Sequence, residues 1–157
     1  MEMQEKKALL EETAKEILEK MGFKANVFIA IDAMGENDLF SVEIQTDESG
    51  YLIGKHGANL SAFQHLFRII IRKKTSEKIH FSVDVNNYRQ DRKQEVVQIA
   101  REALKKLEDE NLEEIALPPM NAFERRIVHL ELENIGNVVT ESVGSDLERK
   151  IIIKKQN

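Results

Sequence analysis

The stretch Ile53-Gly54-Lys55-His56-Gly57 decides the fold that we expect for this chain. It is a G-x-x-G turn with a cation between its glycines. Because glycine has no Cβ, the backbone at Gly54 and Gly57 could pass very close to a bound chain. Lys55 adds a mobile cation, and a helix that begins behind the turn would offer free N–H groups and the positive end of its dipole. These properties suit the sugar-phosphate backbone of a nucleic acid.

The residues behind the turn predict that helix. Apolar side chains recur with helical spacing at Leu60, Phe63, Phe67 and Ile70, so we expect a helix over about residues 58–73. No Asp or Glu occurs between the start of the turn and the end of this helix. A bound phosphate would therefore meet no local carboxylate.

Two other interpretations of the turn compete with a nucleic-acid site. A nucleotide-binding P-loop fits poorly, because residues 50–56 have one residue too few between the glycines. His56 also stands where Mg²⁺ chemistry needs Ser or Thr. A plain surface turn between two helices fits any lone G-x-x-G, so the surrounding elements must decide.

Charge is unevenly distributed along the chain. The net charge is −5, but residues 51–106 hold 12 Lys and Arg against 5 Asp and Glu, a local +7. The flanking segments are acidic. A central basic block indicates a local footprint for a polyanion, although Lys and Arg that merely solvate two helices would give the same pattern.

Length and composition set further bounds. The 157 residues suffice for one medium or two small domains, and 41% of them are hydrophobic, so a core can form. The sequence has no Cys, which excludes a disulfide scaffold and a thiolate metal site and fits a reducing cytosol. The charged start predicts no signal peptide, and the apolar runs are too short to span a membrane. We therefore expect a cytoplasmic protein.

The first half has a readable order of elements. Alternating apolar residues predict a strand at Phe40, Val42 and Ile44. Helical spacing predicts a helix over 4–21, with Leu10, Ala14, Ile17 and Met21 on one face, and one helical turn over 49–53. A strand over 27–31 is followed by a turn over 32–38. A last strand carries Ile79, Phe81, Val83 and Val85. The expected fold class is α+β, with a three-stranded sheet covered by helices on one face.

The second half predicts a smaller α/β unit. Asn87 and Gln90 resemble a capping box for a long helix to about Leu107. Asn121 is the expected N-cap of the next helix, with Glu124 at the reciprocal position. Two strands over 138–143 and 151–153 should surround a turn at Gly144. No Pro- or Ser-rich linker marks a boundary, so the division into 1–86 and 87–157 rests on the end of one α-β-β-α-α-β unit.

That order of elements around the G-x-x-G turn resembles a type II KH domain over residues 1–86. The resemblance implies close backbone approach at Gly54 and Gly57 and a phosphate clamp at Lys55 and His56. KH loops hold about four nucleotides of a single strand, with the bases in an apolar groove. That groove could include Ile53, Leu60 and the strand from Phe40 to Ile44, and the phosphate track could continue over Arg68, Arg72, Lys73 and Lys74.

The residues from Pro118 to His129, with Thr140-Glu141-Ser142-Val143-Gly144 further on, resemble an R-three-H domain, in which an Arg and a His are separated by three residues. Here these are Arg125 and His129, which lie four positions apart and so share a helix face. The resemblance implies nucleic-acid binding: Arg125 could fork onto a phosphate, and His129 could donate to a phosphate or stack on a base. Arg126 is ambiguous, because Glu124 could pair with it. Three apolar residues of this helix should face a core: Phe123, Ile127 and Leu130.

A KH domain joined directly to an R-three-H domain resembles the Jag family of bacterial RNA-binding proteins, also called KhpB or EloR. The family implies a single-stranded RNA-binding protein, with single-stranded DNA as another ligand for the second domain. It also implies RNA-chaperone-like regulation of cell envelope growth, division or sporulation, and a small KH-only protein as partner. Many members carry a further small N-terminal domain and linker. We do not expect either in this sequence, which would be a truncated piece or a short member, so no activity of that part is carried over.

An enzyme fits the sequence poorly. The four His residues are dispersed without metal-ligand spacing, and no Ser lies in a nucleophile motif. We expect no catalytic residue, cofactor or metal. The main alternative to RNA binding is a protein-interaction adaptor with a degenerate KH loop. The intact Gly-Lys-His-Gly turn, without an acid, counts against degeneracy.

Overall fold

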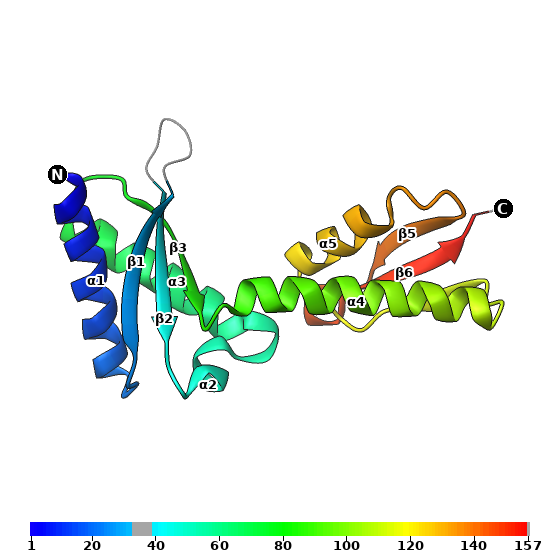
Figure 1. Cartoon of the computed structure of the whole chain (residues 1–157), viewed down its shortest axis with the longest axis horizontal. Helices are drawn as coiled ribbons and strands as arrows, with labels where there is room; N and C mark the ends of the chain where they lie inside the picture. Colours follow the sequence, from blue (N-terminus) through cyan, green and yellow to red (C-terminus); the bar gives the residue numbers. More distant parts are fainter. Residues whose placement is uncertain (33–38, 157) are drawn as a thin grey trace. The chain divides into compact units, whose positions relative to one another are not determined.

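The computed structural model describes residues 1–32 and 39–156 (Figure 1). The chain divides into two compact units, Met1–Arg89 and Gln90–Asn157. Each unit has its own hydrophobic core and three-stranded sheet. The expected α+β class is confirmed. The turn predicted over 32–38 falls on residues outside this description.

The first unit has the predicted α-β-β-α-α-β order. Its elements are α1 (Met3–Lys20), β1 (Asn26–Asp32), β2 (Leu39–Gln45), α2 (Ser49–Ile53), the short 3₁₀ turn η1 (Lys55–Gly57), α3 (Ala58–Lys74) and β3 (His80–Val85). The sheet order is β1-β2-β3, with β1 and β2 antiparallel and β2 and β3 parallel. The parallel pair requires a crossover, and the segment from α2 to α3 provides it.

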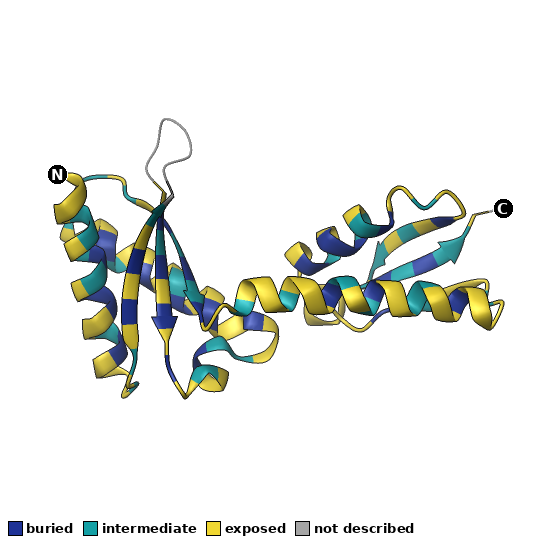
Figure 2. Ribbon diagram, in the orientation of Figure 1, coloured by how far each residue is buried: buried dark blue, intermediate teal, exposed yellow. Residues whose placement is uncertain are grey.

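The core of this unit lies between the sheet and the two long helices. Phe40, Val42 and Ile44 alternate along β2 and are all buried, as the period-two pattern predicted. Phe67 of α3 is fully buried, and its ring centroid lies 4.8 Å from that of Phe81 on β3. Figure 2 colours the buried residues of this unit dark blue, and they occur on α1, on α3 and on the strands of the sheet. This packing fixes α3, and with it the turn at its N-terminus.

Two residues of the predicted helix faces were misplaced. Ile71, not Ile70, occupies the buried position after Phe67, because a helix returns to the same face after four residues here. Met21 lies beyond the end of α1 and is exposed, and Leu18 is buried instead. Both errors shift a side chain by one or a few positions and leave the element order unchanged.

The start of α4 (Tyr88–Asp109) also differs from the expectation. Asn86 and Asn87 both have left-handed backbone conformations, with φ of 48° and 59°. Such a conformation is unlike the extended backbone of a usual N-cap residue. The carboxylate of Asp84 instead accepts a hydrogen bond from the backbone N–H of Arg89 at 3.3 Å. The Asp84 side chain, from the preceding strand, thus caps an N–H group at the start of α4.

The second unit packs α4 and α5 with a second sheet. Besides the part of α4 from Gln90 onward, it contains β4 (Glu114–Ala116), α5 (Ala122–Leu132), β5 (Val138–Val143), the 3₁₀ turn η2 (Asp146–Glu148) and β6 (Lys150–Lys155). The sheet order is β4-β6-β5, and both pairings are antiparallel. The strand β4 was not predicted, because three residues are too few for an alternating pattern to show.

The helix α5 begins as expected but buries a different face. Asn121 accepts a hydrogen bond from the N–H of Glu124 at 2.9 Å, and Glu124 completes the capping box. Ile127 is buried, as predicted. The prediction was wrong for Phe123 and Leu130, which are 61% and 57% exposed. Helical geometry explains this, because the buried face also contains Glu124, Val128 and Leu132, and that places Phe123 and Leu130 at its solvent edge.

Candidate nucleic-acid interface

The G-x-x-G turn joins α2 to α3 through a left-handed backbone. The φ angles are +72° at Gly54, +52° at His56 and +77° at Gly57. Gly57 occupies the N-cap position of α3, and having no side chain it cannot cap the first N–H groups of that helix. Lys55 and His56 are both exposed. The turn therefore presents a cation beside the positive end of a 17-residue helix, an arrangement that favours an anion.

Packing inside the first unit also requires glycine at both positions. A Cβ at Gly54 would lie 2.5 Å from Cγ of Asn59, whose Nδ2 donates to the carbonyl of Tyr51 at 2.8 Å. A Cβ at Gly57 would lie 2.9 Å from Cε1 of Tyr88. Both contacts are too short for real atoms. The space beside each glycine is thus filled by a neighbour of the same unit, and close approach of a ligand backbone stays a prediction.

The apolar groove expected beside the turn is mostly core. Ile53 is half-buried and packs against the core of the first unit. Leu60 and the strand residues Phe40, Val42 and Ile44 are buried, so they cannot line a groove for bases without opening the core. That part of the expectation was wrong, because the periodicity that marks an apolar face does not distinguish a groove from an interior.

The basic residues of α3 have separate environments. Arg68 donates to the carbonyl of Phe81 at 3.3 Å, and its guanidinium lies 6.0 Å from the centre of that ring. Lys74 lies 3.0 Å from Glu16, and hydrogen bonds from Lys20 and Lys74 lower the pKa of Glu16 to about 2. Arg72 is exposed. A continuous phosphate track along α3 is therefore interrupted at Lys74, which an acid already engages.

Arg68 and Arg72 lie around a hollow of about 270 Å³ between α3 and the start of β3. Lys78 and His80 also line it, together with Glu77. Neither Lys78 nor His80 was singled out from the sequence, because each lies in a loop or at a strand end with no motif around it. The sheet brings them beside the two arginines.

Side chains engage the outer edge of β3. Gln64 of α3 accepts from the N–H of Val83 at 2.8 Å, and Nε of Arg89 donates to the carbonyl of Val83 at 3.0 Å. Arg89 also donates to the Gln64 oxygen at 3.1 Å. An edge strand otherwise offers unpaired N–H and C=O groups to any chain nearby. Sequence reasoning missed Gln64 and Arg89, since nothing local signals that they meet at a strand edge.

Arg125 and His129 of α5 are each held by a hydrogen bond. Nη1 of Arg125 donates to the carbonyl of Met120 at 2.6 Å. Nδ1 of His129 forms a hydrogen bond with Oγ1 of Thr140 on β5. Both side chains are half-buried. These contacts fix two polar side chains at neighbouring points of one helix, where each still has surface open to solvent.

A further arginine lies close to these residues. Nε of Arg149 donates to Oγ of Ser142 at 2.8 Å, and the carbonyl of Arg149 accepts from the N–H of Met120 at 2.9 Å. Ser142 lies two residues after Thr140, so both hydroxyls point to the same side of β5. The second unit therefore brings Arg149 into the neighbourhood of Arg125 and His129. The pairing of β5 with β6 places it there, and the sequence contains no spacing that would reveal it.

Arg126 does not have the local partner that we considered. Glu124 is only 2% exposed and accepts from Nε of Arg92 at 2.7 Å. Burial alone would lower the pKa of Arg92, but hydrogen bonds to Glu124 and Glu95 outweigh it and raise that pKa. Arg126 is exposed, and within residues 1–32 and 39–156 it forms no ion pair.

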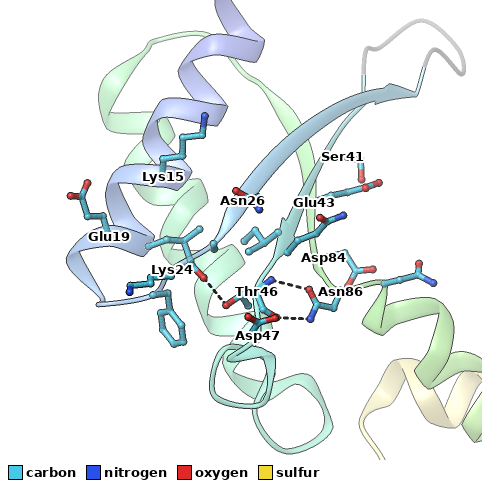
Figure 3. Close-up of a pocket in the computed structure, with 16 residues that line it drawn as sticks. Lys15, Glu19, Lys24, Asn26, Ser41, Glu43, Thr46, Asp47, Asp84 and Asn86 are labelled. Atoms are coloured by element: carbon cyan, nitrogen blue, oxygen red, sulfur yellow. Dashed lines mark hydrogen bonds between the residues drawn. The ribbon is translucent and has the colours of Figure 1, made fainter.

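A further hollow of the first unit lies away from the turn (Figure 3). Its volume is about 1050 Å³, and hydrogen bonds between Thr46 and Asn86 lie at its wall. Four carboxylates and two lysines are among its lining residues: Glu19, Glu43, Asp47, Asp84, Lys15 and Lys24. Three residues of the strand expected in the base groove line it, namely Ser41, Glu43 and Ile44, but no residue of the Gly54 to Gly57 turn does. Its excess of carboxylates would repel phosphate.

The fold and these two basic sites define the class of protein: a KH domain followed by an R-three-H domain. Residues 7–85 match the family model described as the KH domain of KhpA/KhpB, and residues 94–155 match that of the R-three-H domain. The chain belongs to the KhpB family, which is the Jag family of the resemblance noted above.

Individual relatives agree with this assignment. The chain is 33% identical over 156 residues to the RNA-binding protein KhpB of Clostridium symbiosum, covering 97% of this chain and 70% of the relative. It is 27% identical to the RNA-binding protein KhpB of Lactiplantibacillus plantarum, covering 87% of this chain and 41% of the relative. The protein of the same name from Bacillus subtilis is 32% identical over 70% of this chain and 53% of the relative. The chain thus spans about half the length of the latter two relatives.

Among the described residues, no helix combines the length and the apolar character that a membrane crossing requires.

Proposed function

We propose that this chain binds single-stranded RNA through two sites, one in each unit. The observation that carries the proposal is the turn from Gly54 to Gly57. It presents the exposed Lys55 and His56 at the start of α3, a helix whose first turn contains no acid. A phosphate there would meet a cation and the positive end of the helix dipole together. Ile53, which is half-buried, directly precedes the turn, and Arg68 and Arg72 add positive charge further along α3.

The second site supports the same function. Arg125, Arg126 and His129 lie on α5, and Arg149 lies near them through its contacts with Ser142 and Met120. Arginine forks suit phosphate oxygens, and hydroxyl groups such as those of Thr140 and Ser142 are common phosphate donors. Relatives of this chain carry the name RNA-binding protein. Single-stranded DNA is a further ligand that this site could accept.

The biological role that we propose rests on the family resemblance. We propose a cytoplasmic, non-catalytic RNA chaperone or post-transcriptional regulator, linked to cell envelope growth, division or sporulation. A small KH-only protein is the proposed partner, in keeping with the family description that joins KhpA and KhpB.

One observation favours a protein-interaction adaptor as a second candidate. Leu66 and Ile69 of α3 are 47% and 42% exposed, although both are apolar. They lie three positions apart and so share a helix face. A protein partner could cover them, and the G-x-x-G turn would then have no RNA to bind.

Direct binding to a fluorescent single-stranded RNA separates the two candidates. Lys55→Asp with His56→Asp should abolish most binding by the first site, and Arg125→Ala with Arg126→Ala should weaken the remainder. Lys105→Asp with Lys106→Asp is the matched control, because it adds acid at two exposed positions of α4 outside both sites. Circular dichroism must stay unchanged in all three. If neither site variant alters the RNA affinity of the folded protein, RNA binding at these sites is wrong and the adaptor is favoured.

A further inference from the structure

Three exposed side chains form a stripe along α5. Phe123 and Leu130 are large and apolar, yet they are among the most exposed such residues of the second unit. Arg126 is exposed between them. Positions i, i+3 and i+7 lie on one helix face. We call Phe123, Arg126 and Leu130 the α5 stripe. Sequence periodicity assigned its two apolar members to the core, so the stripe is visible only in the structure.

The stripe adjoins the cationic site on the same helix. At about 100° per residue, Arg126 lies about 60° from Phe123 in one direction and about 60° from His129 in the other. Arg125 lies beyond His129 on that second side. The exposed surface of α5 therefore changes from cationic and polar at one edge to apolar at the other, with Arg126 between. The remaining circumference is buried against the core by Ile127, Val128 and their neighbours.

A single nucleic-acid strand has the same division, with phosphates along one side and flat bases along the other. Unpaired bases stack on aromatic rings and on arginine planes. We propose that the α5 stripe receives unpaired bases of a strand whose phosphates are bound by Arg125 and His129. Phe123 supplies a ring for one base, Arg126 a guanidinium plane, and Leu130 an apolar contact. The inference rests on the proposed function of the second unit. It adds that the α5 stripe contacts the bases of the bound strand.

The dimensions and charges agree with this occupant. From Phe123 to Leu130 the helix rises about 10 Å, which matches about three bases at roughly 3.4 Å each. A second copy of the chain or another protein would also cover the two apolar side chains. It would have to bury Arg126 in the middle of the contact, and a buried unpaired guanidinium is unfavourable. A base stacked on the plane of Arg126 leaves the N–H groups at the edge of the guanidinium free for a phosphate of the same strand, so the charge keeps a partner.

A tryptophan at Phe123 gives a local test. The chain has no Trp, so Phe123→Trp creates a single indole at the stripe, and the exposed position should accept it. The full chain would be titrated with a single-stranded RNA and with the same RNA made abasic at every position. Both oligonucleotides should bind, but only the RNA with bases should quench the indole emission, because quenching requires stacking.

Affinity provides the second measurement. In the Lys55→Asp, His56→Asp background, which silences the first site, Phe123→Ala with Leu130→Ala should weaken RNA binding about tenfold. Val139→Ala is the matched control, since Val139 is exposed but lies on β5, where its side chain points away from Thr140. The Val139→Ala variant should bind RNA with the same affinity as the Lys55→Asp, His56→Asp protein.

Each contrary result has a distinct meaning. Saturable RNA binding without quenching, or equal quenching by abasic RNA, overturns the stripe and leaves the proposed function in place. No RNA binding by the unsubstituted chain overturns both. A concentration-dependent rise in mass by analytical ultracentrifugation that Phe123→Ala removes would mean that a second copy covers the stripe, and this too overturns the inference.

Discussion

Glu124 lies 2.7 Å from Nε of Arg92, so the acid nearest in sequence to Arg126 is engaged by an arginine of another helix. Glu124 also completes the N-terminal capping box of α5 with Asn121. One buried carboxylate thus ties α5 to α4 and satisfies the helix start. The consequence for function is that Arg126 keeps its charge available to a ligand.

Glu124→Ala should destabilise the second unit. It removes the reciprocal cap, worth about 1 kcal/mol, and leaves the mostly buried Arg92 without its main partner. We expect a loss of about 3 kcal/mol in the free energy of unfolding, measured from the denaturant midpoint. Glu95→Ala is the control, because Glu95 also pairs with Arg92 but is exposed, and it should cost under about 1 kcal/mol. Equal effects of the two substitutions would contradict the role given to Glu124.

Gly57→Ala should destabilise the first unit even without RNA. Alanine is strained at a φ of +77°, by about 1 kcal/mol, and its Cβ would meet the ring of Tyr88. Combining it with Tyr88→Leu should relieve part of the loss, so the two substitutions should not be additive. Strict additivity in a denaturation double-mutant cycle would show that the ring does not constrain the glycine.

RNA binding should weaken steeply as salt rises. For single strands, the slope of log affinity against log salt is about −0.7 for each phosphate neutralised. Arg126→Ala should reduce the steepness by roughly that amount, since it removes one exposed cation. Arg101→Ala is the control, because Arg101 is paired with Glu131 at 2.6 Å and lies on α4. An unchanged slope in Arg126→Ala would exclude a phosphate contact at that residue.

Thr140→Val should weaken single-strand binding by the second unit severalfold. Valine keeps the shape of threonine but loses the hydroxyl that orients His129, so the imidazole ring becomes free to rotate. Thr140→Ser retains the hydroxyl and should bind nearly normally. The comparison is best made by fluorescence anisotropy with the first site silenced. If valine and serine behave alike, the contact between His129 and Thr140 has no part in binding.

The Glu16 carboxylate should titrate at unusually low pH. Hydrogen bonds from Lys20 and Lys74 lower its pKa from the ordinary 4.5 to about 2. A carboxylate with a depressed folded-state pKa stabilises the fold above its ordinary pKa, and that contribution disappears as pH falls from about 4.5 to about 2. NMR titration of the side chain measures this directly. Lys74→Met should bring the midpoint back toward the ordinary value, and no movement would mean that Lys74 does not contact Glu16 in solution.

Local patterns predicted most elements of this chain. Alternation placed Phe40, Val42 and Ile44 on a strand, and the Asn121 and Glu124 pair located the start of α5. These features depend on neighbouring residues only, so a sequence displays them. Burial was harder to predict. Leu60 was assigned to a groove and is core, whereas Phe123 was assigned to a core and is exposed.

The sequence by itself determined the order of elements in the first unit, the G-x-x-G turn and the Arg125 and His129 pair, because each follows from spacing within one segment. Tertiary structure alone decided what meets across segments. The pairing of β5 with β6 brings Arg149 near Arg125, the position of α4 directs Arg92 to Glu124, and the start of α4 sets Tyr88 against Gly57. Contacts between residues far apart in the chain depend on how whole elements pack, and no local pattern encodes that packing.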